Sequence, residues 1–340
     1  MGTSIRRFTK GSDNNDTKSQ GANSKLEKTA AADTKVPVVS FEDGKRVEKA
    51  ISAQPAVVPA TLGDAKKVAM PLDKTLVERL TPTMRKFLLV GKTVVVTGGA
   101  RGLGFNMAQA MAEVGAKGIA IIDQKRDIGV PAAEELSAQT GVDVRFYEVD
   151  IRDSAQIAGA VKDIKDHYGQ IDVLINSAGI ADSNIPAETY EDDMWEKTID
   201  INLNGAFKIG REVARSMINN KNPGSFVYVA SMSGSIVNYP QEQSCYNASK
   251  AGVVHLVHSL AAEWAKYNIR VNSISPGYMD TALNRVPALD AQKKIWIDQT
   301  PQRRLGNVDE LNNLAVFLAS DASSYMTGAN CIIDGGYCLY

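Results

Sequence analysis

Short runs of aliphatic and β-branched residues alternate with amphipathic stretches from residue 88 onward. The runs have the length and composition of buried strands, whereas the stretches between them repeat apolar residues at helical spacing. Strands that alternate with helices predict βαβ units and a doubly wound parallel α/β sheet of about seven strands, covered by helices on both faces. The expected strands are 92–97, 119–123, 144–149, 171–176, 225–230, 269–274 and 330–334. The clearest expected helices are 106–114, 154–168, 246–266 and 308–319.

The N-terminal segment has a different character. Residues 1–68 are rich in Ser, Thr, Ala, Asp and Lys, and their few apolar residues show little periodicity. Such a segment cannot bury enough apolar surface to offset its ordering entropy, so we expect a disordered arm over 1–68. A transitional arm is expected over 69–87, and one folded domain over 88–340. A spacing of four apolar residues predicts a short helix in the transitional arm, formed by Leu76, Leu80, Met84 and Leu88.

Composition and charge narrow the class of protein. Hydrophobic residues make up 44% of the chain, and the formal net charge of −1 gives no reason to expect nucleic acid or an anionic membrane as a partner. No run of roughly 20 apolar residues appears, so we expect no membrane span. The three cysteines are too few for a disulfide framework and lack metal-ligand spacing, which favours a reducing compartment.

Basic residues near the start of the chain are relevant to where in the cell the protein is located. Arg6, Arg7 and Lys10 can begin a mitochondrial presequence. Asp13 and Asp16 follow at once, and such presequences avoid acidic residues. A cytoplasmic location is therefore favoured over a mitochondrial one.

A glycine-rich turn, Thr97–Gly104, follows the first expected strand and opens the first expected helix. Glycines let the backbone turn tightly and approach a pyrophosphate, and a helix N-terminus presents free N–H groups and positive dipole. An acidic residue follows about 20 positions on, as in dinucleotide-binding turns. The pattern predicts a bound dinucleotide in preference to a purely structural turn. The residues expected to contact it are Gly98, Arg101, Gly102, Leu103 and Gly104.

Two aspartates at strand ends are candidates for the adenosine half of that dinucleotide. Asp123 ends the second strand, where a carboxylate accepts hydrogen bonds from both ribose hydroxyls and repels a 2′-phosphate, which favours NAD over NADP. Arg101 and Lys125-Arg126 keep NADP open, because each can pair with a phosphate. Asp150 and the adjoining Ile151, after the third strand, are expected near the adenine. Asp123 can instead cap the segment that follows it, and Asp150 can instead cap the next helix.

Tyr246 and Lys250 are four residues apart on an expected helix, so both side chains point to the same face. Three further motifs follow strands: 176–179 after the fourth, Ser231 after the fifth and Pro276-Gly277 after the sixth. Together with the glycine turn, they resemble the short-chain dehydrogenase/reductase family over roughly three quarters of the chain. The resemblance implies a Rossmann-type fold and an NAD(P)-dependent enzyme that moves a hydride between nicotinamide and a small alcohol or ketone.

Proton transfer explains why a tyrosine and a lysine are paired. Oxidation of an alcohol needs a base for the hydroxyl proton, and the reverse reaction needs an acid. A free tyrosine, with a pKa of about 10, is a poor base at neutral pH, and a nearby ammonium lowers that value. We therefore expect Tyr246 to act as acid and base, and Lys250 to lower its pKa with help from the positive charge of the oxidised nicotinamide.

The resemblance adds two roles beside this pair. It implies that Lys250 holds the nicotinamide ribose, and that Asn202 holds a water linking Lys250 to solvent. Asn204 is the nearby alternative. Asn202 can instead satisfy backbone groups in a helix kink.

Two serines compete to stabilise charge on the reacting oxygen. Counting back from Tyr246 favours Ser233, whereas the end of the fifth strand and the glycine three residues later favour Ser231. We choose Ser231, because a strand end fixes geometry while the following loop varies in length.

The resemblance also assigns residues to the nicotinamide end of the cleft. Asn176 and Gly179 are expected to line it. Pro276 and Gly277 are expected to lie under the nicotinamide, and Thr281 to bond its carboxamide.

The stretch 282–304 is helical but interrupted by Pro287 and Pro301. It matches the family's mobile substrate lid, which can exclude water on closing. Trp296 falls in this lid and either packs there or faces the substrate.

The run from Ser231 through Gln243 resembles fungal polyol dehydrogenases, those for arabinitol, mannitol, xylulose and sorbose. Gln241 and Glu242 can offer polar contacts to sugar hydroxyls. We favour NAD-dependent oxidation of a sugar alcohol at a secondary carbon to a ketose. The alternatives are a reductase of other ketones or 3-oxoacyl groups, which can use NADPH, and an NAD-sensing binding protein without turnover.

A metal site and the oligomeric state complete the expectations. His255 and His258 lie one helical turn apart, but no third ligand is in view, so helix packing is favoured and no metal is expected. The resemblance implies a homotetramer or homodimer, with 334–340 as an interface end.

Overall fold

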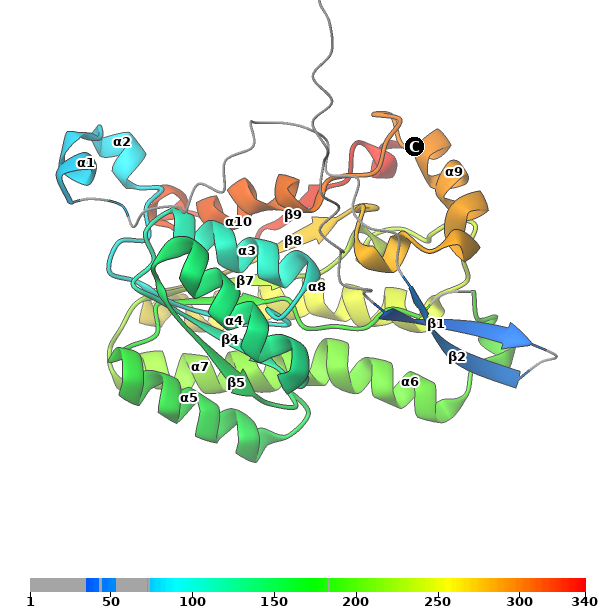
Figure 1. Ribbon diagram of the computed structural model, residues 1–340, viewed down its shortest axis with the longest axis horizontal. Helices are drawn as coiled ribbons and strands as arrows, with labels where there is room; N and C mark the ends of the chain where they lie inside the picture. Colours follow the sequence, from blue (N-terminus) through cyan, green and yellow to red (C-terminus); the bar gives the residue numbers. More distant parts are fainter. Residues whose placement is uncertain (1–34, 43–44, 53–71, 73, 183) are drawn as a thin grey trace, which may run out of the picture. The chain divides into compact units, whose positions relative to one another are not determined.

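The computed structural model describes residues 35–42, 45–52, 72, 74–182 and 184–340. Within them, seven parallel strands form one sheet in the order β5-β4-β3-β6-β7-β8-β9 (Figure 1). This confirms the predicted doubly wound sheet. The strands are β3 (Thr93–Thr97), β4 (Gly118–Asp123), β5 (Asp143–Glu148), β6 (Val173–Asn176), β7 (Gly224–Val229), β8 (Ile269–Pro276) and β9 (Asn330–Ile333).

Helices cover both faces of this sheet, because each connection between parallel strands must cross over it. Figure 1 shows α3 and α10 on one side of the strands and α5 and α7 on the other. The helices in the described residues are α1 (Lys74–Arg79), α2 (Pro82–Arg85), α3 (Gly102–Glu113), α4 (Arg126–Thr140), α5 (Ser154–Tyr168), α6 (Asp192–Ile199), α7 (Ala206–Asn219), α8 (Ser244–Trp264), α9 (Asp290–Gln299) and α10 (Asn312–Ala319). None of these helices is long and apolar enough to cross a membrane.

Two hydrophobic cores result from the alternation of side chains along the strands. Val95 and Leu174 face one core, with apolar residues of α5, α7 and α8. Val94 and Val96 face the other, with residues of α3, α4 and α10. The central strands are buried on both faces, which explains why they appear as continuous apolar runs in the sequence.

The single short helix expected over 76–88 is two helices, α1 and α2. Proline lacks an amide hydrogen and is favoured at the first position of a helix, so Pro82 ends one helix and starts the next. The Thr81 hydroxyl caps α2 by accepting a hydrogen bond from the Met84 amide at 3.3 Å. The spacing of apolar residues alone did not indicate this break.

Two strands lie within the segment expected to be disordered. β1 (Lys35–Glu42) and β2 (Lys45–Ser52) pair antiparallel, from Lys35 opposite Ser52 to Glu42 opposite Lys45. The structure differs here from the expectation, and the rest of 1–68 lies outside the described residues. The sequence between the strands is Asp43-Gly44, and an Asp-Gly dipeptide is a strong sequence signal for a hairpin.

Candidate active site

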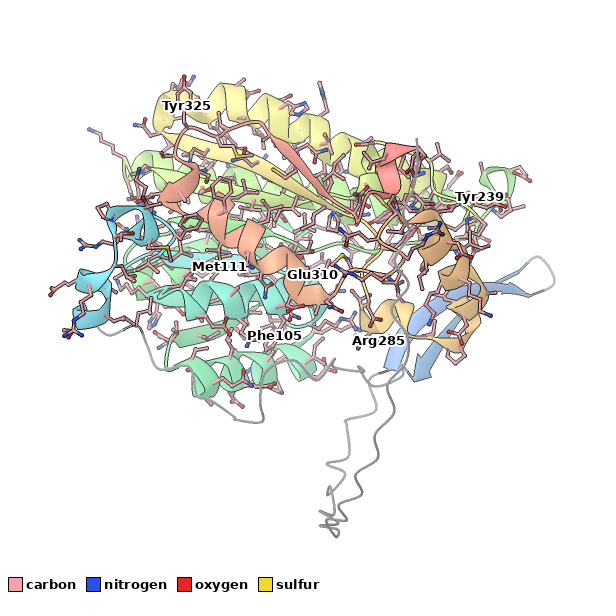
Figure 2. The ribbon with its side chains drawn as sticks, turned by 90° about the horizontal axis from the view of Figure 1, so that it is seen from above. Phe105, Met111, Tyr239, Arg285, Glu310 and Tyr325 are labelled. Atoms are coloured by element: carbon pink, nitrogen blue, oxygen red, sulfur yellow. The ribbon has the colours of Figure 1, made fainter. Side chains whose placement is uncertain are left out.

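The carboxyl ends of β3 and β6 mark the point where the strand order reverses, since the chain leaves β3 for β4 on one side and β6 lies on the other. Ligands of open α/β sheets bind in the crevice at this point. The lid stretch also lies at this end of the sheet: Figure 2 shows Arg285 and Tyr239 together at one end and Tyr325 at the opposite end.

The glycine turn after β3 is built so that only glycine fits. Gly98 has a φ of 63°, and a Cβ on it would lie 2.9 Å from the Ala178 Cα. A Cβ on Gly104 would lie 2.3 Å from the Gly98 carbonyl oxygen. Arg101 is the N-cap of α3, but its side chain makes no capping hydrogen bond. The turn therefore brings bare backbone and the N–H groups of α3 to the crevice, which fits a dinucleotide pyrophosphate.

Thr97 joins the glycine turn to the neighbouring strand. Its Oγ1 donates to Asn176 Oδ1 at 3.0 Å and accepts from the amides of Ser177 and Ala178, each at 3.1 Å. The Asn176 amide donates to the Ala206 carbonyl at 2.9 Å. Asn176 is buried and its amide is held within the fold, so it orders the loop that leads to Gly179. No pattern in the sequence indicated this role of the Thr97 side chain.

Asp123 and Asp150 have different surroundings. Asp123 is half-buried at the end of β4 and accepts a hydrogen bond from the Lys125 amide at 3.3 Å. Asp150 forms an ion pair with Arg152 at 2.5 Å, and this hydrogen-bonded guanidinium lowers the pKa of the Asp150 carboxyl. Asp153, not Asp150, caps α5 by accepting from two of its amides. The capping role considered for Asp150 is therefore wrong.

Ile151 is buried against a π-helical turn, Asp200–Gly205, that joins α6 to α7. Asn202 lies in this turn with 1% of its surface exposed. Its Oδ1 accepts from the Ile180 amide at 2.8 Å, and its Nδ2 donates to the Ile180 carbonyl at 2.9 Å and to Ser249 Oγ at 3.0 Å. Asn202 thus satisfies backbone groups of the loop after Gly179, as one of the two alternatives expected. Asn204 is bonded to Asp200 instead.

Tyr246 and Lys250 lie one turn apart on α8. The Lys250 Nζ is 5.7 Å from the centre of the Tyr246 ring and donates to the Val229 carbonyl at 2.9 Å. A Cβ on Gly179 would lie 3.5 Å from this Nζ and 3.2 Å from Asn202 Oδ1. The structure therefore brings Tyr246, Lys250, Asn202 and Gly179 together at the crevice.

Burial disfavours the charged form of both members of the pair. It lowers the pKa of Lys250 to about 8 and raises the pKa of Tyr246. The Ser231 hydroxyl partly offsets the rise in the pKa of Tyr246. The expected lowering of the Tyr246 pKa by Lys250 is therefore not found, because desolvation dominates in the protein alone.

Ser231 and Ser233 are adjacent in space but have different neighbours. Their hydroxyl oxygens share a hydrogen bond of 3.1 Å, and Ser231 Oγ accepts from the Ser233 amide at 3.2 Å. Ser231 is the serine that lowers the pKa of Tyr246. Ser233 accepts from Gln243 Nε2 at 3.3 Å and lies behind Ser231.

The segment after β8 continues the floor of the crevice. Gly277 crosses β9 so closely that a Cβ on it would lie 2.6 Å from the Asp334 Cα, and its amide donates to the Ile333 carbonyl at 2.9 Å. Pro276 is buried, and the half-buried Thr281 precedes the short 3-10 turn Ala282–Asn284.

The lid consists of that turn, a second 3-10 turn (Pro287–Leu289) and α9. Gln241 is buried beneath it: its Nε2 donates to the Tyr278 hydroxyl, and its Oε1 accepts from Trp296 Nε1, each at 2.9 Å. Glu242 is exposed. Trp296 is buried and stacks on Tyr278 with 4.1 Å between ring centres. Gln241 and Trp296 are thus hydrogen-bonded to each other beneath the lid. This corrects the interpretation that Gln241 meets substrate hydroxyls.

The remaining candidates show no metal chemistry. His255 and His258 are exposed on α8, with ring centres 5.9 Å apart in an edge-to-face arrangement. Among the described residues, no group of three or more histidine, cysteine or acidic side chains is placed to hold a metal ion.

The sequence of this chain is similar to a protein-family model and to several known proteins. A family model described as enoyl-(acyl carrier protein) reductase matches residues 98–338. Sorbose reductase from Schizosaccharomyces pombe is 42% identical over 253 residues, covering 74% of this chain and 98% of that protein. An NADP-dependent mannitol dehydrogenase from Alternaria alternata is 43% identical over 257 residues (74% and 94%). A ribulose-forming D-arabinitol 2-dehydrogenase from Scheffersomyces stipitis is 40% identical over 266 residues (74% and 95%).

Solved structures agree with these relatives. A short-chain type dehydrogenase/reductase from Mycobacterium marinum superposes with a TM-score of 0.73 at 36% identity, covering 76% of this chain and all of that one. An NAD+-bound xylitol dehydrogenase superposes with a TM-score of 0.68 at 33% identity, covering 73% and 99%. The aligned share of this chain corresponds to nearly the whole of each relative.

Proposed function

Because the chain belongs to the short-chain dehydrogenase/reductase family, and is thus an oxidoreductase of alcohols and ketones, we propose that it interconverts a sugar alcohol and its ketose with NAD. One observation carries the proposal. The Ser231 hydroxyl is near enough to Tyr246 to lower the pKa of the phenol, and the buried Lys250 ammonium lies 5.7 Å from the centre of the same ring, at the crevice where the glycine turn presents its backbone.

In the proposed oxidation, Tyr246 takes the proton from the substrate hydroxyl as the C–H bond breaks and the C=O bond forms. Ser231 donates a hydrogen bond to the reacting oxygen and holds it beside Tyr246. NAD+, when bound, supplies the hydride acceptor and a positive charge. That charge adds to the ammonium of Lys250, and together they offset the burial that raises the pKa of Tyr246. The proton then leaves Tyr246 through the neighbouring Lys250.

The preference for NAD rests on Asp123. Its carboxylate stands at the end of β4, where it can accept both ribose hydroxyls and repel a 2′-phosphate. Nearby cations do not neutralise it in the described structure: Arg126 pairs with Glu148 at 3.7 Å instead. The mannitol dehydrogenase relative is named as NADP-dependent, so this preference is a proposal about the present chain.

The substrate class rests on the relatives, whose names include reductases or dehydrogenases of sorbose, mannitol and D-arabinitol. A steady-state screen of pentitols, hexitols and their ketoses, each with NAD and NADP, tests it. We expect turnover of at least one pentitol or hexitol with NAD. Turnover of acyl ketones alone would overturn the polyol proposal.

A second candidate is reduction of 3-oxoacyl or other ketone groups on the same residues. The description of the matching family model names an acyl carrier protein substrate, although for an enoyl group rather than a ketone. The same screen decides between them if it includes a 3-oxoacyl thioester with NADPH. Tight NAD binding without turnover of any alcohol or ketone would instead support an NAD-sensing protein.

We also propose a cytoplasmic homo-oligomer, a tetramer or dimer. Size-exclusion chromatography with light scattering measures the assembly, and fractionation of the source cells measures the location. A monomer, or a mitochondrial pool, would overturn the corresponding part.

A further inference from the structure

A continuous chain of buried amide and hydroxyl groups runs from Ser231 to the lid. Gln243 is at its centre and has 7% of its surface exposed. Its Nε2 lies within hydrogen-bond distance of Ser233 Oγ at 3.3 Å, Asn238 Oδ1 at 2.8 Å and Asn247 Oδ1 at 3.0 Å. An amide nitrogen has two hydrogens, so three acceptors compete for them. All three acceptors therefore depend on how this one side chain is oriented.

The first branch of the chain leads to the catalytic candidate. A hydroxyl has one hydrogen, so Ser231 cannot donate both to Ser233 and to a substrate oxygen. Gln243 donates to Ser233, and hydrogen bonds in a chain strengthen one another. This favours donation from Ser233 to Ser231. The two hydroxyl oxygens are 3.1 Å apart, and either hydroxyl can be the donor, because each carries one hydrogen that rotates. With Ser233 as the donor, Ser231 Oγ accepts from the hydroxyl and the amide of Ser233, and its own hydrogen is left for the reacting oxygen.

The second branch leads to the lid. Asn238 Nδ2 donates to the Tyr278 hydroxyl at 2.9 Å, and Gln241 donates to the same oxygen at 2.9 Å. Gln241 Oε1 in turn accepts from Trp296 Nε1 at 2.9 Å, on α9. The rings of Tyr278 and Trp296 are nearly parallel, at 7°. Movement of α9 would therefore disturb bonds that reach back to Gln243.

We propose that Gln243 is a positioning residue that orients the Ser231 hydroxyl through Ser233 and couples that orientation to lid helix α9 through Asn238, Tyr278 and Gln241. The inference rests on the proposed function and deepens it. It explains how closure of the lid and orientation of the Ser231 hydroxyl toward the reacting oxygen occur together. Gln243 acts through Ser231 and needs no contact with the substrate.

A double-mutant cycle tests the first branch. We compare wild type, Gln243→Leu, Ser231→Ala and the double variant on the best polyol from the screen. Gln243→Leu is expected to lower kcat about tenfold, the effect of losing one oriented hydrogen bond, with little change in KM. In the Ser231→Ala background the same substitution is expected to change kcat less than about twofold, because no hydroxyl is left to orient. Equal effects in both backgrounds would overturn the proposal.

A separate variant tests the second branch, which leads to the lid. Trp296→Phe keeps an aromatic ring on Tyr278 but removes the indole N–H that bonds Gln241. It is expected to lower kcat, and to do so less when Gln243→Leu is already present. An unchanged kcat in Trp296→Phe would contradict coupling to the lid.

Controls separate this proposal from misfolding and from the proposed function. Gln139→Leu removes an exposed glutamine that bonds Glu135 on α4, and it is expected to leave kcat unchanged. Thermal unfolding and NADH fluorescence titration check that each variant folds; if Gln243→Leu does not, Gln243→Met replaces it in the cycle. An inactive Tyr246→Phe together with an additive cycle would refute the positioning role alone. An active Tyr246→Phe would refute the proposed function itself.

Discussion

The Lys250 ammonium lies 5.7 Å from the centre of the Tyr246 ring and is held by the Val229 carbonyl, at the end of strand β7. Ser231 follows two residues later on the same segment. One strand end therefore supplies Ser231 and positions the Lys250 ammonium, and α8 supplies Tyr246 and Lys250. The arrangement depends on packing between two regular elements, so we expect it to be rigid.

The burial of Lys250 predicts a dependence of stability on pH. Its pKa is lowered from 10.5 to about 8 in the folded protein, so between these values the unfolded chain binds a proton that the folded protein lacks. Stability from this group must therefore rise as pH increases from about 8 to 10.5. At about 1.4 kcal/mol per pH unit, the gain is roughly 3 kcal/mol at most.

Denaturant unfolding of wild type and Lys250→Met at pH 7, 8.5 and 10 measures this dependence. The free energy of unfolding of wild type should rise relative to that of the variant across the series. Parallel pH profiles for the two proteins would show that Lys250 keeps an ordinary pKa.

The glycine turn predicts a sharp difference between two glycine substitutions. Gly104→Ala places a Cβ 2.3 Å from the Gly98 carbonyl oxygen, so the turn must distort. We expect the Kd for NADH to rise more than about tenfold, with a loss of stability of roughly 1–3 kcal/mol. Fluorescence titration and thermal unfolding measure the two effects.

Gly159→Ala is the matched control. Gly159 lies in α5, and a Cβ there meets nothing within 4 Å. Alanine favours helix more than glycine does, so this variant should be about 0.5–1 kcal/mol more stable, with unchanged NADH affinity. Similar losses of affinity in both variants would mean that the turn does not hold the cofactor.

Asp123 predicts the cofactor preference. Asp123→Ala removes the carboxylate that accepts the ribose hydroxyls and repels a 2′-phosphate, so kcat/KM should fall with NAD and rise with NADP. We expect the NAD/NADP ratio to drop at least about tenfold. Asp127→Ala, an acidic residue in the first turn of α4, is the control for a general change in charge. An unchanged ratio in Asp123→Ala would mean that this carboxylate does not meet the ribose.

Much of the fold followed from local patterns in the sequence. Buried strands of a parallel sheet appear as short apolar runs, and all seven were predicted within a few residues of their observed ends. Asp153 and Gly169 bracket α5 as a cap and a stop, and this helix spans the predicted range. Local signals can also be overlooked: Asp43-Gly44 marks the β1–β2 hairpin and Pro82 separates α1 from α2.

The site was predictable where it depends on spacing along the chain and unpredictable where it depends on contacts across it. Tyr246 and Lys250 share a helix face, so four residues of spacing are enough to pair them. The hydrogen bond between Gln241 and Trp296 joins residues 55 positions apart, and no local pattern indicates it. The burial that raises the pKa of Tyr246 in the protein alone was unpredictable for the same reason, because sequence shows which groups are neighbours but not how deeply they are buried.

The central claim is that the Tyr246 hydroxyl exchanges the proton during hydride transfer. Tyr246→Phe keeps the ring and removes only that hydroxyl, so the Kd for NADH should stay within about threefold of wild type while kcat with the best polyol falls at least about a thousandfold. Measuring both on the same preparation is the most direct test. Unchanged binding with turnover lost is the predicted result, and substantial turnover by Tyr246→Phe would contradict the account.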